Sequence, residues 1–404
     1  MDFSDYTYSA EIQAAFFNAE AELLRLGGRL ERSRFARYLK KPLLAIDAIF
    51  AIRTSHKDIT LPVVPLVAAY DMMGKKHPAD EMRKNDVFRS LGISISDIDR
   101  PVVNEALHYM QTMNWISENA TSGFKVNMET VMRIHEYLLS GITDDERYSG
   151  FRKIPLPNGR GVDPHAIPSA VNELCDFINS DMFSPLGQAS VIHHAFERIV
   201  PFDSMVDRTG LMLAFMPMFM RGLFANGYVV PICWGMSIDR ERRNRILDST
   251  RDDPKLESYR EYRDFWASHN ARNTFLAAAI ANSFINAAEQ IHDTWRSRCL
   301  QVQANSTIDR LLDLILANPC ITVGYAAESI RKSYGATNEA MQQLIRAGIV
   351  RESVSHGRER VFVCDKSAAM MTDFVARLMK LREDAKPNEA KEGNFTHLDK
   401  ESTF

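Results

Sequence analysis

The sequence predicts a mainly α-helical protein with a small α+β domain near its C-terminus. Two observations predict this fold class: apolar residues recur at helical spacing through most of the chain, and a helix–helix–helix–hairpin pattern follows residue 301. A length of 404 residues suits two or three domains. We expect a helical region at 1–100, a helical domain at 101–300, an α+β domain at 301–370 and a disordered charged tail at 381–404.

Net charge, cysteine spacing and the lengths of the apolar segments limit the classes of protein that this chain can belong to. A net charge of −3 gives no global attraction to nucleic acid, so contact with DNA would need a local basic patch. The five cysteines form no CxxC pair, which excludes a zinc ribbon and favours a reducing compartment. The N-terminus does not resemble a secretory signal, and the most apolar stretch, 211–220, is too short to span a bilayer. We therefore expect a cytoplasmic protein with no membrane partner.

Helical spacing and chain breakers place the elements in order. Pro62 and Pro65 interrupt the second helical pattern. The stretch 150–166 is rich in Gly and Pro, and this predicts a loop or a short hairpin. Helices are expected at 12–30, 41–52, 100–119, 128–140, 168–180, 189–199 and 207–221, with further helical runs to residue 298.

Residues 307–364 predict a winged helix-turn-helix. A helix at 307–317 comes first. Thr322 is expected to cap a second helix, and Thr337 is expected to cap the third after a turn at 334–336. Gly348 would close the third helix. The expected second helix, third helix and two β-rich runs of the wing lie at 323–329, 338–346, 349–354 and 360–364.

The third helix of this domain and its wing are the candidate DNA contacts. Asn and Gln side chains can hydrogen-bond adenine edges, and Arg can hydrogen-bond guanine. Six basic side chains against three acidic ones make the segment locally positive. The predicted DNA-binding residues are Asn338, Gln342, Gln343, Arg346, Arg358 and Arg360. A winged helix used for protein contact is the alternative, and a homodimer is the usual expectation for regulators of this kind.

The segment 193–213, HHAFERIVPFDSMVDRTGLML, resembles the signature of the Fic family (Fic/Doc, or Fido fold). That signature is His, Pro-Phe, any residue, Asp or Glu, Gly-Asn-Gly-Arg, two residues and Arg. Residues 133–139 resemble the family's Leu-His-x-x-Leu-Leu helix. Gly150, Phe151 and Arg152 resemble the start of the β-hairpin flap that aligns a target peptide, and 165–168 resemble the segment after it. A winged helix after the core is also known in the family, so the resemblance covers roughly 10–365.

The resemblance implies transfer of AMP, or a related phosphate-containing group, from a nucleotide to a protein hydroxyl, with ATP and Mg²⁺ as cofactors. The chain departs from the motif where that chemistry resides. Val200 replaces the histidine base, whose loss typically costs about 10²- to 10⁴-fold in rate. Ser204 replaces the metal-binding acid and is a poor anchor for Mg²⁺. Residues 205–207 (Met-Val-Asp) replace the glycine-lined phosphate cradle, and Leu211 replaces the second arginine, while Arg208 is retained.

Several losses together argue against the family's chemistry. Asp207 would also repel nucleotide phosphates, by roughly 4 kcal/mol at ~4 Å and an effective dielectric constant of about 20. Our leading hypothesis is a DNA-binding transcriptional regulator whose Fic-like core serves dimerisation or ligand sensing, with no metal and no cofactor. The altered motif, in which no catalytic set is intact, comprises Val200, Pro201, Phe202, Asp203, Ser204, Asp207 and Arg208.

Two other hypotheses stay open. The first is an active nucleotidyltransferase in which Asp203 or Asp207 replaces the lost metal ligand or the lost general base. The second is a scaffold that binds a protein partner, with the flap gripping a peptide strand. His193 lies about 10 Å before Val200 along a helix, so we expect a structural histidine there. The family's inhibitory helix has its nearest match at residues 54–58, without the glutamate.

Overall fold

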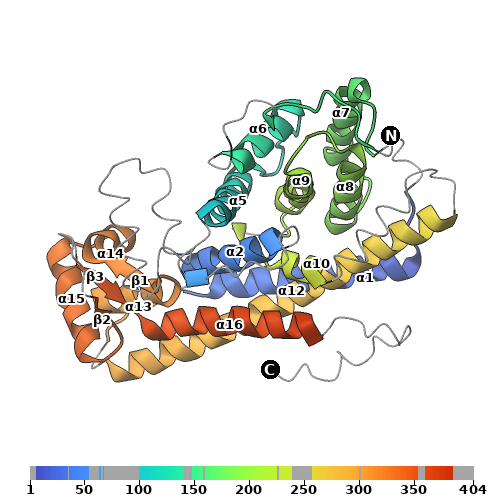
Figure 1. Ribbon diagram of the computed structural model, residues 1–404. Coiled ribbons are helices and arrows are strands. Elements are labelled where there is room, and N and C mark those ends of the chain that lie inside the picture. The colour runs from blue at the N-terminus through green and yellow to red at the C-terminus, as the bar shows by residue number, and fades with distance from the viewer. Residues whose placement is uncertain are drawn as a thin grey trace.

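The computed structural model describes residues 6–34, 36–53, 63–64, 67, 100–140, 143, 148–157, 160–224, 227–238, 257–299, 302–353 and 360–384. The protein is mostly α-helical, with one small sheet near its C-terminus, so the predicted mainly helical class is confirmed (Figure 1). The N-terminal and central helices are α1 (Ala10–Arg32), α2 (Ala36–Arg53), α5 (Arg100–Asn119), α6 (Met128–Leu139), α7 (Ile167–Ile178), α8 (Pro185–Ile199), α9 (Val206–Met220), α10 (Ile232–Ile238) and α12 (Glu257–Arg298).

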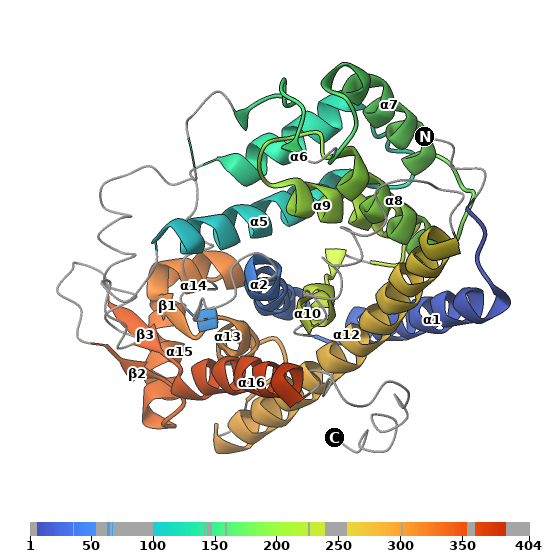
Figure 2. The ribbon, with the colours of Figure 1, turned by 45° about the vertical axis from the view of Figure 1, so that its right-hand side comes forward.

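The helices α8 and α9 pack closely against each other. Every residue of α9 from Arg208 to Phe219 is buried, and Pro217 is accommodated inside the helix. Figure 2 shows α9 enclosed by α5, α6 and α8. α8 begins at Pro185, four residues earlier than expected, because the Ser184 hydroxyl accepts a hydrogen bond from the Gly187 N–H at 3.3 Å and caps the helix. No described helix is both long and apolar enough to cross a membrane.

The helix α12 connects the two ends of the molecule. It has 42 residues and is therefore about 63 Å long. Near its start, the indole N–H of Trp266 donates to the carbonyl of Ser190 on α8 at 3.1 Å. The helix then packs along α1 and reaches the C-terminal elements (Figure 1). A single rigid element thus links the central helices to the small domain.

The C-terminal elements are α13 (Thr307–Ala317), β1 (Cys320–Thr322), α14 (Val323–Ile330), α15 (Tyr334–Arg346), β2 (Arg351–Glu352), β3 (Val361–Val363) and α16 (Asp365–Asp384). The strands form one antiparallel sheet in the order β1-β3-β2, with Ile321 opposite Phe362 and Arg351 opposite Val363. The ends of α13 agree with the prediction. Strand β1 was not expected, because a run of three residues before a helix cap carries no periodicity of its own.

The turn before α15 was predicted wrongly. α15 begins at Tyr334, and Ser333 is its cap, since the Ser333 hydroxyl accepts from the Ala336 N–H at 3.3 Å. Thr337 is fully buried inside the first turn, where its hydroxyl donates to the Ser333 carbonyl at 2.9 Å. The cap at Thr322 is confirmed, and Gly348 closes α15 with a φ of +65°, as expected.

Two further expectations need correction. The described residues of 150–166 form no strand of a β-hairpin flap; they are loop with 3-10 geometry at Pro157 and in η4 (Pro164–Ala166). α16 continues to Asp384, so residues 381–384 are helical and do not belong to a disordered tail. Arg358, the segment 54–58 and the tail residues 385–404 lie outside the described part of the chain.

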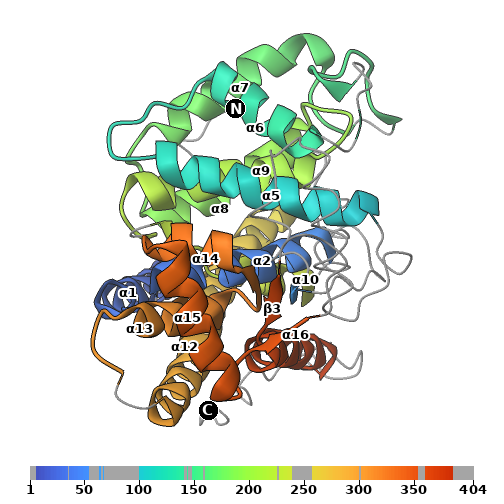
Figure 3. The same cartoon turned by 90° about the vertical axis from the view of Figure 1, so that its left-hand side faces the viewer.

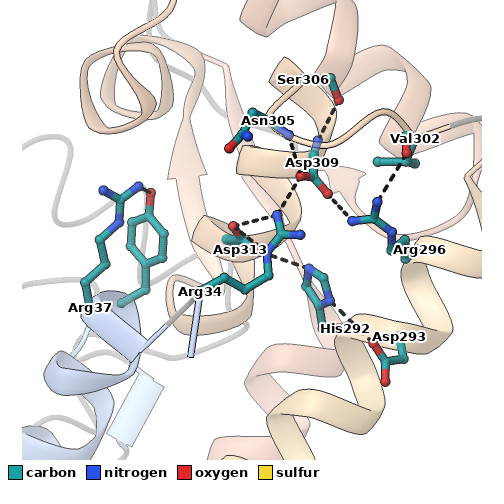
Figure 4. A network of polar contacts seen from close by, with 11 residues as sticks. Arg34, Arg37, His292, Asp293, Arg296, Val302, Asn305, Ser306, Asp309 and Asp313 are labelled. Carbon is teal, nitrogen blue, oxygen red and sulfur yellow. Dashed lines mark hydrogen bonds and ion pairs between the residues drawn. The ribbon is translucent and has the colours of Figure 1, made fainter. Parts of the chain in front are cut away.

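A buried polar network joins the small domain to the central helices (Figure 4). Asp309 on α13 is fully buried; it accepts from Arg34 at 2.6 Å and also from Arg296 on α12. Asp313, one turn later, binds Arg34 at 3.0 Å and pairs with His292 of α12 at 2.9 Å. Because Arg34 precedes α2, three separate chain segments meet at α13. Burial raises the pKa of Asp309, but the hydrogen bonds from Arg34 and Asn305 outweigh it and hold the pKa below its usual value.

Candidate functional site

The loop between α8 and α9 contains the altered motif and has two left-handed turns. Val200, the C-cap of α8, has φ 46° and ψ 64°, and Met205, just before α9, has φ 54° and ψ 22°. A left-handed conformation costs roughly 1–2 kcal/mol for a residue with a side chain, and more for a β-branched one. Met205 stands where the motif has its first glycine, so the backbone turn is present without the glycine.

Phe202 anchors this loop to the core. Its ring is 1% exposed and stacks on His135 of α6, with centroids 3.6 Å apart and planes 3° apart. His135 is fixed in turn, because its Nε2 lies 2.8 Å from the Tyr148 carbonyl and its Nδ1 lies 3.4 Å from the Thr209 hydroxyl. Burial lowers the pKa of His135 and favours its neutral form. The His135 ring therefore holds Phe202, and with it the motif loop, against α6.

Arg152 was predicted as a flap residue that contacts substrate, but its side chain is only 2% exposed. Its guanidinium donates to the carbonyl of Val200 at 2.7 Å, to that of Ile154 at 3.2 Å and also to that of Val162. The Val200 carbonyl is at the C-terminal end of α8, where a cationic donor is favourable. Gly161 leaves the room this requires, since a Cβ there would lie 2.7 Å from Arg152 Nη2. Arg152 is therefore a positioning residue that joins the flap segment to the motif loop.

Arg208 also binds within the protein. Its Nη2 lies 2.5 Å from Glu105 Oε1 of α5, and the two side chains are 5% and 8% exposed. Its Nη1 lies 3.3 Å from Asp207 Oδ1. Charged side chains that are buried to this extent are stable only when they are paired with an opposite charge. The retained arginine of the motif thus forms an ion pair between α9 and α5. Glu105 lies in a helix without a local motif, so sequence reasoning did not find it.

The other polar side chains of the motif do not point toward a common binding site. Asp203 is exposed, whereas Asp207 turns toward Arg208. The Ser204 hydroxyl is buried and makes no hydrogen bond with the described residues. Asp207 is in the first turn of α9, but it does not cap the helix, because the N-cap is Met205. No three His, Cys, Asp or Glu side chains in the described ranges gather as a metal site.

His193 and His194 lie in the core, away from the loop. They are 2% and 1% exposed. His193 lies against Trp266, with ring centroids 4.9 Å apart. The Tyr6 hydroxyl is 3.1 Å from Nδ1 of His194, and burial lowers the pKa of His194 to about 3. Neither ring is placed to act as a base at Val200, in agreement with the structural role expected from the sequence.

A buried carboxylate that the sequence analysis did not single out contacts α5 at Tyr109, one turn after Glu105. Asp47 of α2 is fully buried; it accepts from the Tyr109 hydroxyl at 2.7 Å and from the Cys233 N–H at 3.0 Å. Burial raises its pKa to about 6, against the opposing effect of the two hydrogen bonds. The one available signal was an aspartate inside the apolar run LLAIDAIFAI of α2.

The comparisons with known families bear directly on the elements from α6 to α9. The model of the Fic/DOC family matches residues 125–218, which include α6, the segment 148–166, α7, α8, the motif loop and most of α9. Residues 125–218 form a Fic/DOC domain. No curated protein matches the chain.

Solved structures of Fic proteins also resemble this chain. A Fic family protein from Desulfovibrio desulfuricans G20 is 13% identical, with a TM-score of 0.45, over 89% of this chain and 97% of that one. A Fic domain containing signaling protein from Bacteroides thetaiotaomicron VPI-5482 is 14% identical, with a TM-score of 0.43, over 66% and 98%. Fic-1 from C. elegans is 12% identical, with a TM-score of 0.44, over 68% and 74%.

The predicted DNA-contacting residues lie well outside the Fic/DOC domain, on α15 and at the start of β3. Gln343 and Arg346 of α15 are exposed, whereas Asn338 and Gln342 are half-buried. In Figure 1 α15 lies at the left edge of the molecule, away from α7 and α8, and in Figure 3 it faces the viewer. Arg360 is exposed, but it binds both carboxylate oxygens of Glu352 on β2, at 2.6 and 2.5 Å. The residues of α15 are therefore better placed for an external ligand than Arg360.

The Arg208–Glu105 pair can be tested by removing its charges one at a time. Arg208→Met leaves Glu105 buried without a counter-charge, so we expect the free energy of unfolding to fall by about 3–5 kcal/mol. Glu105→Leu added to this variant should recover most of the loss, because no buried charge remains. Urea denaturation measures both values. A double variant as unstable as Arg208→Met would contradict the assigned role of the pair.

Asp47 should make stability depend on pH. Its pKa is about 6 in the folded protein and about 4 in the unfolded chain, so the folded state holds more protons between these values. The free energy of unfolding should therefore fall by about 3 kcal/mol as pH rises from about 4 to 6, and stay level above that. Asp47→Asn should remove this slope in urea titrations, whereas the control Asp181→Asn, at an exposed site, should keep it.

Proposed function

We propose that this protein is a DNA-binding transcriptional regulator in which the Fic/DOC domain has lost nucleotide transfer. One observation carries the proposal: α15 presents Gln343 and Arg346 to solvent on a small domain with the element order of a winged helix-turn-helix. That order is α13, β1, α14, α15, β2 and β3. In such domains the third helix lies in the major groove of DNA, and the strands after it contact the backbone.

The two faces of α15 support this role. Ala340, Met341 and Leu344 are buried in the core of the small domain, which fixes the orientation of the helix. The opposite face holds an amide at Gln343 and a guanidinium at Arg346, the groups that pair with adenine and guanine edges. No described acidic side chain forms an ion pair with Arg346, so its charge is available to a ligand.

Phosphate contacts would come from several exposed cations near α15. Arg331 and Lys332 are exposed in the turn before α15. Arg351 pairs with Asp365 at 2.7 Å, and Arg360 pairs with Glu352, but both pairs are on the surface. Exposed ion pairs are worth about 0–1 kcal/mol, so a DNA phosphate can displace them. The wing is therefore less basic than a count of its arginines indicates, and α15 carries more of the proposed contact.

The residues of the motif loop do not suit the ATP and Mg²⁺ that active Fic enzymes use. The base position is Val200, which cannot accept a proton, and Ser204 offers a single neutral oxygen to a metal. Asp207 brings a negative charge to the start of α9. The cation that remains, Arg208, is paired with Glu105 in the core. A phosphate bound here would have to compete with a buried carboxylate.

The DNA-binding proposal makes a prediction about two side chains. Arg346→Ala and Gln343→Ala should each weaken binding to the preferred sequence by about 5- to 150-fold, since a base contact is worth about 1–3 kcal/mol. Arg377→Ala is the matched control, because Arg377 is an exposed arginine on α16 outside the small domain. The preferred sequence is selected from fragmented genomic DNA, and affinity is then measured by fluorescence anisotropy at fixed salt. Failure to enrich any sequence would contradict the proposal.

A second candidate function, protein adenylylation, is favoured by one feature of the loop. Met205 keeps the left-handed turn of the motif, and no side chain caps the N-terminus of α9, so its first N–H groups face the loop as they would face an anion. ATP with Mg²⁺ tests this directly. The regulator proposal predicts no change in unfolding temperature with the nucleotide. A rise of several degrees, together with transfer of labelled AMP to protein, would favour the enzyme instead.

A further inference from the structure

The helix α1 has an apolar face that no described part of the protein covers. Its inner face packs on the core. On the opposite side, six small or apolar residues recur at alternating intervals of four and three. We call this set the outer stripe of α1; it consists of Ala10, Ala14, Phe17, Ala21, Leu24 and Gly28. This alternation is the seam pattern of two helices packed along their length.

The outer stripe is open to solvent. Phe17 is 70% exposed and Leu24 is 55% exposed, although burying either side chain would be worth roughly 1.5–3 kcal/mol. A Cβ added at Gly28 would meet no atom within 4 Å. Figures 2 and 3 both show α1 at the edge of the molecule. Ala10, Ala14, Phe17 and Leu24 are exposed, whereas Ala21 and Gly28 are half-buried. The helix that carries the stripe is about 35 Å long for 23 residues.

We propose that the outer stripe binds the same stripe of a second copy of this chain, with the two α1 helices antiparallel about a two-fold axis near Asn18. The sizes of the side chains fit this arrangement. Phe17 of one copy would lie against Ala21 of the other, Leu24 against Ala14, and Ala10 against Gly28. Each large residue therefore meets a small one, and the axis repeats every contact twice. A parallel pair would instead place Phe17 against Phe17 and leave gaps at the alanines.

The charges beside the stripe fit the same axis. Glu11, Asn18 and Arg25 are seven residues apart along one edge of the stripe, and all three are exposed. The stripe contacts centre the pair at residue 19, and Glu11 with Arg25 is centred at residue 18, about 1.5 Å away along the helix. Each Glu11 therefore lies beside Arg25 of the other copy, which makes two equivalent ion pairs. Arg25 pairs with Glu22 on its own helix at 2.9 Å, but at 72% exposure it keeps donors for a second carboxylate. The charge order of α1 is therefore complementary to itself under this symmetry.

This dimer requires neither DNA binding nor loss of nucleotide transfer. A single pair of helices buries less surface than a standard stable interface, so we expect self-association at micromolar concentrations. Two copies joined in this way would carry two copies of α15 on one symmetric particle.

Sedimentation of the full chain tests the stripe. The protein should dimerise with rising concentration, and Phe17→Glu with Leu24→Glu should raise the dimer dissociation constant at least about tenfold, because four charges would enter the seam. Ile154→Glu is the control, since Ile154 is 75% exposed but lies in the flap segment. Circular dichroism confirms that each variant is folded. A protein that stays monomeric at ~100 μM, or a dimer unaffected by the two changes, would overturn the proposal.

Exchanging the charges tests the axis. Glu11→Arg and Arg25→Glu should each weaken self-association, because each variant opposes like charges. Mixing the two single variants should restore association, since every ion pair in the mixed dimer is then between opposite charges, and the double variant should self-associate like the original protein. Mixtures that associate no better than the separate variants would exclude the antiparallel arrangement.

A cysteine at the axis gives an independent readout. The five native cysteines are all buried, so Asn18→Cys introduces an accessible thiol. Two such thiols would meet at the axis and form a disulfide-linked dimer under mild oxidation. Gln13→Cys, on the same helix, is the control, because its two copies would lie about 20 Å apart. Equal crosslinking of both variants, or flotation of a monomeric protein with phospholipid vesicles through Phe17 and Leu24, would refute the dimer.

Discussion

An arginine and a glutamate that are both almost excluded from water hold the motif loop against α5. Arg208 and Glu105 stabilise each other only as a pair, because an isolated charge at either position would lack both solvent and a partner. Arg152 completes the arrangement by binding three backbone carbonyls around Val200. Arg152 and Arg208 are thus both engaged by the protein itself. The shape of the loop follows from these contacts and requires no bound nucleotide.

Local signals predicted the helices well wherever a cap or a breaker was unambiguous. Both ends of α13 and α5 agree with the sequence patterns. The start of α15 does not, since Ser333 and Thr337 are equally good caps four residues apart. Only the burial of Thr337 distinguishes them, and burial depends on the packed domain. Gly and Pro predicted a loop or a short hairpin in the flap segment, and the family resemblance implied the hairpin. The backbone N–H groups of Arg152 and Val162 instead donate to the carbonyls of Pro201 and Ile199 beside the motif loop.

The sequence predicted where the altered motif lies, but it did not predict which residues contact the motif. The motif brings Val200 and Ser204 of the loop and Arg208 of the first turn of α9 close together in the chain, and the structure keeps them in these neighbouring elements. The partner of Arg208 comes from a helix about a hundred residues earlier, where nothing local marks Glu105. Arg152 shows the same limit, because a guanidinium that binds carbonyl groups leaves no pattern in the sequence. Side-chain pairing across long separations in the chain is a property of the fold, and single-sequence reasoning cannot supply it.

The length of α12 has a mechanical consequence. Trp266 fixes one part of this helix to α8, and the network around Asp309 and Asp313 clamps the other end to the first helix of the small domain. A straight helix of about 63 Å behaves as a lever, so a tilt of only about 3° at α8 displaces the far end by about 3 Å. A shift of that size is comparable to the spacing of successive base pairs along a duplex. A rigid tilt of α12 about its contact with α8 would therefore move α13, to which its far end is bound, by a distance of this size.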